Sequence, residues 1–423
     1  MPKIRWLIIW MCFIANAISY IDRANLAIAA PVIRHELGLD AAAMGLVLSA
    51  FFWTYAAMQL PAGWIIDHIG VRLSLALAVG WWSLFTIATG FARGISQFIG
   101  ARLMLGVGEA ASLPSFTKVA FNWFPRRERG LACSIFNSGS TAGSALSIPL
   151  VTWLIVIVGW RGAFIVTGLL GIVWVALWWF VYRDPERHRA IAPAEVDALL
   201  AERAAPALAT TKISWGDLFR YRSIWGLMIG MFCLNFAIYF FITWFPSYML
   251  QARGFSLTSF AGLGMAPALS AIAGNWLGGW TSDRLLRKGW SATKARKTCL
   301  VGGMLVASSI GISAFVGSVY LCLALFALAY ASLSFAGANT WTVVSEMAPT
   351  PGHVASMGGI QNFAGNLAGI MISTFTGVML AITKGSFLVP LATAGGLCVV
   401  GALSYLFVVG KVEPLPPLAR EKV

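Results

Sequence analysis

Long apolar segments separated by short polar breaks run along nearly the whole chain. A helix that crosses the hydrocarbon core of a membrane needs about 20 apolar residues, and most of these segments reach that length. Their lengths and breaks predict twelve membrane-spanning helices, near residues 6–31, 42–66, 73–92, 95–123, 130–158, 162–181, 223–250, 258–281, 298–317, 319–346, 354–382 and 386–410.

One long polar segment, about residues 182–222, lies between the sixth and seventh predicted spans. It predicts an N-terminal six-helix half (1–181), a cytoplasmic central loop (182–222), a C-terminal six-helix half (223–410) and a cytoplasmic tail (411–423). The predicted fold class is therefore an all-α membrane protein with twelve transmembrane helices in two pseudo-symmetric six-helix halves.

Composition and charge support a membrane protein. Of the 423 residues 59% are apolar and 11% are charged, whereas soluble domains have about 25% charged residues. The net charge of +14 would suggest a nucleic-acid partner in a soluble protein, but here it follows the loops. With both termini in the cytoplasm, 22 of the 30 Lys and Arg residues fall on cytoplasmic segments and five on outer segments. Because Lys and Arg resist translocation, we expect a multi-pass protein of the cytoplasmic (inner) membrane and no nucleic-acid partner.

The six cysteines all lie in apolar segments, without the spacing or the neighbouring histidines of a metal site. We expect them to be buried packing residues, and we expect no metal or other cofactor. The first apolar segment is longer than the apolar region of a signal peptide and contains two charged residues, so we expect it to be retained as a span.

A short motif recurs 216 residues apart, at the predicted cytoplasmic ends of the second and eighth spans. The copies are Gly63–Asp67 and Gly279–Asp283. We expect the glycine to let two helices approach and the aspartate to pair with nearby basic residues at this rim. Lys118, near another span end, is expected to extend its ammonium group to the surface. The predicted gating residues are Asp67, Asp283, Arg72 and Arg284.

Four charged residues lie inside predicted spans, where each costs at least about 2.5–3.5 kcal/mol. They are Asp22, Arg23, Arg102 and Glu109. At 1.5 Å per residue, Arg23 lies about 12 Å, Arg102 about 10 Å and Glu109 about 20 Å from the outer surface, so the two arginines can share a layer. Seven residues make nearly two turns, which places Arg102 and Glu109 on one face. We expect Gly106 and Gly108 to leave room beside them.

Two arginines beside titratable carboxylates are typical of an anion-binding site, because a guanidinium binds a carboxylate in a two-pronged geometry. Tyr20 shares the helical face of Arg23, whereas Asp22 points about 100° away. Filling or emptying the site changes the charge around Asp22 and Glu109, and with it their protonation. The alternative is that these four charges form a static network that fixes helix packing.

The C-terminal half has no charge in the middle of a span and carries amide, hydroxyl and aromatic groups instead. Such groups suit sugar hydroxyls when they face a cavity, and an aromatic ring can pack on a carbon skeleton. The alternative is hydrogen bonding between helices, the usual role of such groups in spans. The candidates are Asn235, Tyr239, Thr243, Asn339, Thr340, Trp341, Gln361, Asn362 and Asn366.

The repeated motif resembles the loop signature G-x-x-x-D-R-x-G-R-[KR] of the major facilitator superfamily, with His68 where that pattern has arginine. Further stretches, spread over nearly the whole chain, resemble the anion:cation symporter family within it, whose bacterial members include proton-coupled importers of hexuronates, galactonate and glucarate. These stretches are Tyr20–Asn25, Tyr55–Trp64, Arg102–Glu109, Gly159–Phe164, Thr243–Tyr248 and the segment with Asn362 and Asn366.

The resemblance implies roles for individual residues. Arg23 would bind the substrate carboxylate with help from two tyrosines, and Asp22 and Glu109 would carry protons. Arg102 would pair with Glu109 or steer the anion, and Ser140 is expected to face the same layer. The expected substrate-binding residues are Arg23, Tyr20, Tyr55, Arg102, Ser140, Tyr239, Thr340, Trp341, Asn362 and Asn366.

Together these features predict a proton-coupled symporter that imports a small organic anion of the sugar-acid type (hexuronate, aldonate or aldarate) by alternating access. The alternatives are transport of an aromatic or short dicarboxylic acid, and a receptor that binds an anion without transporting it. We expect no enzyme, because the sequence has no catalytic histidine in a span and no G-x-S-x-G turn. The expected partners are the anion, protons and the lipid bilayer, and the expected state is a monomer.

Overall fold

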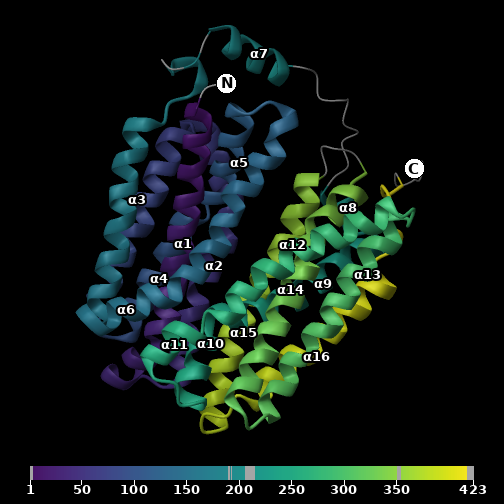
Figure 1. Ribbon diagram of the computed structural model, residues 1–423. Helices are drawn as coiled ribbons and strands as arrows, with labels where there is room; N and C mark the ends of the chain where they lie inside the picture. Colours follow the sequence, from purple (N-terminus) through teal and green to yellow (C-terminus); the bar gives the residue numbers. More distant parts are fainter. Residues whose placement is uncertain (1–2, 189–190, 192, 205–214, 350–353, 417–423) are drawn as a thin grey trace. The chain divides into compact units, whose positions relative to one another are not determined.

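The computed structural model describes residues 3–188, 191, 193–204, 215–349 and 354–416 (Figure 1). Every regular element in this part of the chain is a helix, as the sequence predicts. Contacts divide the chain into two compact units, a first unit of residues 1–206 and 245–265 and a second unit of residues 207–244 and 266–423. Each unit is described by itself.

The first unit is built from the N-terminal part of the chain together with three short helices from later in the sequence. Its elements are α1 (Lys3–Leu37), α2 (Ala41–Ile69), α3 (Val71–Thr89), α4 (Ile95–Glu109), α5 (Ser112–Trp123), α6 (Arg126–Val181), the 3₁₀ helix η1 (Pro185–Arg187), α7 (Pro193–Ala204), α10 (Phe245–Ser247), the π-helix η2 (Tyr248–Ala252) and α11 (Leu257–Leu263).

The second unit contains the remaining helices. Its elements are α8 (Trp215–Leu218), α9 (Arg222–Thr243), α12 (Ala266–Arg287), α13 (Ala292–Ala307), the 3₁₀ helix η3 (Ser308–Phe315), α14 (Val319–Met347), α15 (Val354–Ile382), α16 (Leu388–Leu403) and the π-helix η5 (Ser404–Val408).

The predicted spans are found as helices. Ten helical stretches of the described residues are long and apolar enough to cross a membrane. One of them lies in α6, which runs for 56 residues and breaks at Gly159, where a φ of 71° lies in the left-handed region that favours glycine, so α6 supplies two spans. The fourth span is α4 followed by α5, with a turn between them. Pro114 explains this turn, because proline has no N–H to donate to the Ala110 carbonyl.

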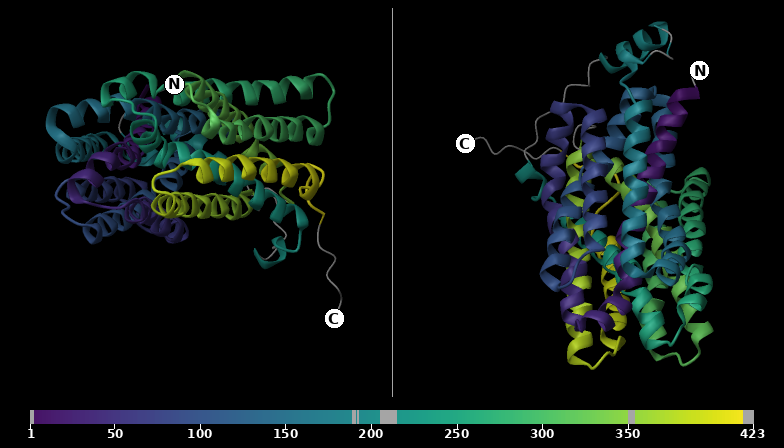
Figure 2. Two further views of the ribbon diagram at one scale, coloured as in Figure 1. Left: turned by 90° about the horizontal axis from the view of Figure 1, so that it is seen from below. Right: turned by 90° about the vertical axis from the view of Figure 1, so that its left-hand side faces the viewer.

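Small residues allow the closest helix contacts in both units. In the first unit α1 packs along α6, and a Cβ added at Gly143 would lie 2.3 Å from the Ala17 carbonyl oxygen. In the second unit α12 packs along α14, and a Cβ added at Gly278 would lie 2.2 Å from the Phe335 carbonyl oxygen. Figure 2 shows these helices running lengthwise beside their partners within each unit. Such backbone-to-backbone packing is how helices associate where no water drives them together.

Residues 245–265 belong to the first unit although they follow α9 in the sequence. Their helix α10 packs on α1, and α11 packs on α6. Arg34 Nη1 also donates a hydrogen bond of 3.0 Å to Gln251 Oε1. The polar loop places residues 245–265 in the predicted C-terminal half, whereas their contacts place them in the first unit.

Candidate substrate and ion site

The charged residues of the predicted spans gather in the first unit. Arg23 on α1 and Glu109 at the end of α4 form an ion pair, with Arg23 Nε 2.6 Å from Glu109 Oε2. The arginine side chain is 10% exposed and the glutamate side chain 0%. Within the described part of the chain, Glu109 Oε1 has no hydrogen-bond partner. A guanidinium binds carboxylates in a two-pronged geometry, so Arg23 is a candidate for binding an anion.

Three aromatic rings surround the Arg23 guanidinium. Its Cζ atom lies 4.8 Å from the ring centroid of Tyr20, 4.6 Å from that of Phe51 and 4.8 Å from that of Tyr55. Phe51 and Tyr55, one turn apart on α2, stack with their centroids 5.2 Å apart. Each such cation–π contact contributes about 0.5–2 kcal/mol, so the rings hold the guanidinium in place. The Arg23 cluster is defined as Arg23, Glu109, Tyr20, Phe51 and Tyr55.

Phe51 is a member of this cluster that the sequence analysis missed. A phenylalanine in an apolar span carries no polar group that would distinguish it from lipid-facing or packing residues. The one available signal is its position four residues before Tyr55, which places both rings on the same face of α2.

Asp22 points about 100° away from Arg23 around α1, as adjacent positions on a helix do. It is 1% exposed, and neither of its carboxylate oxygens has a hydrogen-bond partner among the residues described. The hydroxyls of Thr86 on α3 and Thr167 on α6 face the carboxylate without reaching hydrogen-bond geometry. Burial of a charged carboxylate without a hydrogen-bond partner costs several kcal/mol, so Asp22 is a candidate for binding a proton.

Arg102 on α4 lies in the same region and is buried. Its Nη2 atom donates a long hydrogen bond of 3.4 Å to the Arg23 carbonyl oxygen. Its charge acts on both Asp22 and Glu109. The structure therefore brings Arg23 and Arg102 into one layer, as the depth of each residue along its helix predicts.

Gly106 and Gly108 do not leave open space beside the charged residues of α4, contrary to expectation. A Cβ added at Gly106 would lie 2.4 Å from the Phe51 carbonyl oxygen on α2. A Cβ at Gly108 would lie 2.9 Å from Trp81 Cδ1 on α3. These glycines instead let α2 and α3 approach α4 closely, which brings the α2 side chains of the Arg23 cluster to the guanidinium.

Ser140 on α6 uses its hydroxyl within its own helix. Ser140 Oγ donates a hydrogen bond of 2.7 Å to the Asn137 carbonyl oxygen. Its own carbonyl accepts a hydrogen bond of 2.9 Å from Ser144 Oγ. The role of Ser140 in substrate binding stays a prediction.

The second unit contains the predicted amides. Asn366 Nδ2 donates 3.1 Å to the Asn362 carbonyl oxygen within α15, and Gln361 Nε2 lies 3.4 Å from Met231 Sδ on α9. On α9 itself, Asn235 Nδ2 donates 3.0 Å to the Met231 carbonyl oxygen. These contacts within and between helices are those that the structural alternative expects, and substrate binding by Asn362 and Asn366 stays a prediction.

The other candidates of the second unit differ in exposure. Thr340 is buried, and its hydroxyl donates 2.8 Å to the Gly337 carbonyl of its own helix, α14. Tyr239 is half-buried on α9, and its carbonyl accepts a hydrogen bond of 2.6 Å from the Thr243 hydroxyl. Trp341 is 52% exposed, and its ring lies beside Gly358 of α15, so its role in substrate binding stays a prediction.

The gating residues of the first unit pair differently from the prediction. Asp67, with a side chain 71% exposed, forms an ion pair of 2.6 Å with Lys118 on α5. Arg72, the expected partner, instead donates 2.6 Å to the Trp179 carbonyl oxygen and lies 4.3 Å above the Trp179 ring. Arg72 lies in the first turn of α3 and contacts the end of α6, whereas Lys118 on α5 lies beside the end of α2.

The second copy of the motif is also corrected. Asp283 lies 3.4 Å from Arg296 Nη1, and Arg296 Nη2 lies 2.9 Å from Glu346 Oε1 on α14. Arg296 further donates 2.7 Å to Ser282 Oγ. Arg284, the expected partner, is exposed and lies over the Trp280 ring at 4.9 Å. Arg296 was missed because it lies 13 residues beyond Asp283 on the next helix, α13.

The motif glycines do not bring helices together. A Cβ added at Gly63 or at Gly279 would meet nothing within 4 Å. In the second copy the close approach belongs to the preceding residue, Gly278, on the face of α12 that packs on α14. Adjacent glycines of a helix point about 100° apart, so only one of them can face a given neighbour.

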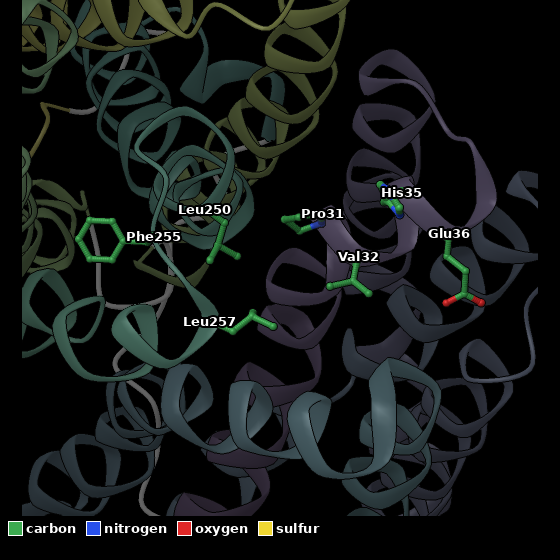
Figure 3. Close-up of a pocket in the computed structure, with 7 residues that line it drawn as sticks. All are labelled: Pro31, Val32, His35, Glu36, Leu250, Phe255 and Leu257. Carbon is green, nitrogen blue, oxygen red and sulfur yellow. The ribbon is translucent and has the colours of Figure 1, made fainter.

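A separate cavity of about 530 Å³ lies in the first unit, between the end of α1 and the α10–α11 segment. Figure 3 shows Pro31 and Val32 on one side of it and Leu250 and Leu257 on the other. Its lining contains none of the residues predicted to bind substrate or protons. The candidate site therefore rests on the charged cluster and not on this cavity.

The sequence profile of the Major Facilitator Superfamily matches residues 12–373. The chain belongs to this superfamily. Its members are transporters, so the chain is not an enzyme, and it is a multi-pass membrane protein with the predicted all-α fold. The resemblance stated from the sequence motifs is confirmed.

Several relatives within the superfamily match almost the whole chain. The D-galactonate transporter of Escherichia coli O6:H1 is 36% identical over 97% of this chain and 96% of its own length. The probable galactarate/D-glucarate transporter GudP of Bacillus subtilis (strain 168) is 36% identical over 97% and 93%. The probable sulfoacetate transporter SauU of Cupriavidus necator is 32% identical over 96% and 94%.

A solved structure supports the fold. The bacterial homolog of the human lysosomal transporter Spinster, inward-facing and unoccupied, superposes with a TM-score of 0.73 over 97% of this chain and 95% of that chain. At 20% sequence identity this likeness bears on the fold alone.

Proposed function

We propose that this protein is a proton-coupled symporter that imports a sugar acid across the cytoplasmic membrane by alternating access, as a monomer with both termini in the cytoplasm. The observation that carries the proposal is the ion pair between Arg23 and buried Glu109 inside a cage of aromatic rings. Arg23 is the anion-binding group, and Glu109 is its resident anion.

The coupling follows from competition for one guanidinium. A substrate carboxylate that binds Arg23 displaces Glu109 and leaves a buried carboxylate without its counter-charge. Such a charge costs several kcal/mol, and uptake of a proton removes this cost. Anion and proton therefore enter the site together, and release of the anion lets Glu109 return its proton and pair with Arg23 again.

The remaining groups fit this scheme. Tyr20, Phe51 and Tyr55 hold the guanidinium in a fixed orientation, so that a carboxylate meets it in the two-pronged geometry. Asp22 is a second proton-accepting group, and Arg102 steers the anion through its charge. The amides Asn362 and Asn366 are the candidates for recognition of sugar hydroxyls.

The substrate class rests on the relatives. Those named for galactonate and for galactarate and glucarate are more similar to this chain than the one named for sulfoacetate. An acid with several hydroxyl groups is therefore the proposed cargo.

The test is uptake of labelled acids into proteoliposomes that contain the purified full-length protein, with and without an inward proton gradient. The panel holds galactonate, glucarate, glucuronate, sulfoacetate, phthalate and tartrate. We expect one sugar acid to accumulate only with the gradient. We expect Glu109→Gln to lose this accumulation and to keep exchange of internal for external substrate, because a neutral amide frees Arg23 but carries no proton.

The matched control is Glu36→Gln. This substitution removes an exposed carboxylate in the last turn of α1 that pairs with Arg161. This variant should accumulate substrate as the natural protein does. Accumulation by Glu109→Gln at the natural level would refute the coupling mechanism, and accumulation of sulfoacetate alone would refute the substrate class.

A further inference from the structure

The segment that follows η5 lies against the second unit. Val409, Val412 and Leu415 are at most 9% exposed, whereas the residues between them are exposed. Every third side chain is thus buried, and a repeat of three is that of an extended chain of the polyproline type. Pro414 and Pro416 suit this conformation, because proline restricts φ to the range that such a chain uses.

Backbone N–H groups of this segment bond to the ends of neighbouring helices. Gly410 N donates a hydrogen bond of 3.1 Å to Ser223 Oγ in the first turn of α9. Val412 N donates 2.9 Å to Thr293 Oγ1 in the first turn of α13. Residues 409–416 are defined here as the strap.

The strap also reaches a third helix and the chain that leads into α9. Leu415 N donates 3.0 Å to the carbonyl oxygen of Met347, the last residue of α14. Tyr221, just before α9, donates 2.5 Å from its hydroxyl to the Pro416 carbonyl oxygen. The strap therefore ties together one end of α9, α13 and α14.

Two cations hold the point at which the strap leaves η5. Lys297 Nζ on α13 donates 3.1 Å to the Leu406 carbonyl oxygen and 2.5 Å to that of Val409. Arg222 Nη2 on α9 donates 3.0 Å to the Phe407 carbonyl oxygen. Such charge-assisted bonds to the last carbonyls of a helix are among the stronger hydrogen bonds of a protein, so the start of the strap is firmly placed.

The strap contacts α13 and α14 beside the ion pair that joins these two helices. Thr293 lies less than one turn before Arg296 on α13, and Met347 directly follows Glu346 on α14. Arg296 Nη2 lies 2.9 Å from Glu346 Oε1. Because the strap and the ion pair link the same two helix ends, we expect each to depend on the other.

We propose that the strap holds Glu346 within reach of Arg296 and so sets how readily this end of the second unit opens. Its bonds to Ser223 and to Tyr221 are exposed, so the strap can separate while the helices stay folded. The inference goes beyond the proposed function and does not rest on it, because it concerns the second unit alone and no substrate.

The experiment measures how fast N-ethylmaleimide alkylates Cys299 in the purified full-length protein, by mass spectrometry of its peptides. Cys299 is 1% exposed and lies three residues beyond Arg296 on α13, so it reacts when this end opens. Removal of residues 411–423 should raise its rate about tenfold, which corresponds to about 1.4 kcal/mol, the order of one lost hydrogen bond. Cys322, equally buried near the opposite end of α14, is an internal control and should keep its rate.

The matched control is removal of residues 417–423, which keeps the strap and should leave the rate of Cys299 unchanged. Thr293→Val keeps the whole chain and removes only the acceptor for Val412 N. This variant should raise the rate of Cys299 by about threefold to tenfold. Thr298→Val changes an exposed threonine of the same helix and should have no effect.

Thermal unfolding tests whether the strap acts on the ion pair. Glu346→Gln and removal of residues 411–423 should each lower the unfolding midpoint by at least about 2 °C. The combined variant should lose clearly less than the sum of the two shifts, because both changes weaken the same contact.

An unchanged rate of Cys299 after removal of residues 411–423 would overturn the proposal. An equal increase after removal of residues 417–423 would also overturn it, since the contacts of the strap would then not be responsible. Midpoint shifts that simply add would show that the strap does not hold Glu346. None of these measurements uses a substrate, so their failure is distinct from a failure of the proposed function.

Discussion

The interiors of the two units carry different chemistry. In the middle of its spans the first unit holds the charged side chains of Asp22, Arg23, Arg102 and Glu109. Arg23 pairs with Glu109 among the rings of the Arg23 cluster, and Asp22 has no hydrogen-bond partner in the described part of the chain. In the second unit the charged cluster of Arg296 lies at the ends of the helices, and the middle of the spans carries amides and hydroxyls, of which Asn235, Thr340 and Asn366 bond to carbonyl groups of their own helices. An ion pair changes its partners when an anion or a proton arrives, whereas a hydrogen bond within a helix has no such reason to change. We therefore propose that coupling belongs to the first unit and hydroxyl recognition or packing to the second.

The largest expected effect is that of Arg23→Ala. Uptake should fall at least about 100-fold, because the charge-assisted pair with the substrate carboxylate is lost. The unfolding free energy should fall by about 3–5 kcal/mol, since Glu109 remains buried without a counter-charge. Proteoliposome uptake and thermal unfolding measure the two effects.

The control for Arg23→Ala is Arg161→Ala, which breaks an ion pair whose side chains are 41% and 44% exposed. Exposed pairs contribute about 0–1 kcal/mol, so this variant should stay stable and active. Normal uptake by Arg23→Ala would show that the buried charges only fix helix packing.

A second comparison concerns the gating residues of the two units. Arg296 is 8% exposed and contacts Asp283, Glu346 and Ser282, whereas the Lys118–Asp67 pair lies at the surface. Arg296→Met should lower the unfolding free energy by about 3–5 kcal/mol, and Lys118→Met by less than about 1 kcal/mol. Thermal unfolding of the two variants tests this order, and equal losses would contradict it.

Loss of one ring of the Arg23 cluster should have an intermediate effect on substrate affinity. Phe51→Leu removes one of the three cation–π contacts on Arg23, worth about 0.5–2 kcal/mol, and should raise KM for the substrate by about threefold to thirtyfold. Phe51→Tyr should restore most of the affinity, because a phenol ring keeps the interaction. Phe98→Leu, a buried ring of α4 that packs on Trp160, is the control and should leave KM unchanged. An unchanged KM in Phe51→Leu would exclude a positioning role for this ring.

The smallest expected effect separates the two interpretations of the second unit. Asn366→Ala should raise KM for a sugar acid by about threefold to tenfold if its amide binds a hydroxyl group, with no change in the dependence of uptake on the proton gradient. Uptake measured at several substrate concentrations gives KM. A stability loss with unchanged KM would favour the packing role, and a change in proton dependence would contradict the division of roles between the units.

Part of the candidate site could be predicted from the sequence. Charged residues inside apolar segments can be recognised in the sequence, because a charge in a membrane span is costly and is kept only for function or pairing. The rise per residue of a helix then places Arg23 and Arg102 at a similar depth. Helical geometry also predicts that Asp22 and Arg23 face different surroundings. The ring of Phe51 and the hydroxyls of Thr86 and Thr167 could not be found this way, because neither residue type is unusual in a span.

The gating residues show the limit of sequence proximity. Arg72 and Arg284 are close to the motif aspartates in sequence, yet Lys118 and Arg296 are the partners in space. The partners come from other helices, and the choice depends on which faces of α5 and α13 turn toward the ends of α2 and α12.

The sequence by itself determined the helical fold, the number of spans and the presence of an ionic interior, since hydropathy, length and the cost of buried charge act locally along the chain. Only the tertiary structure decided which guanidinium meets which carboxylate, which glycines bring helices together and which oxygens surround Asp22. These outcomes depend on contacts between helices far apart in sequence, and the closest of them are set by distances of a few ångströms between backbones.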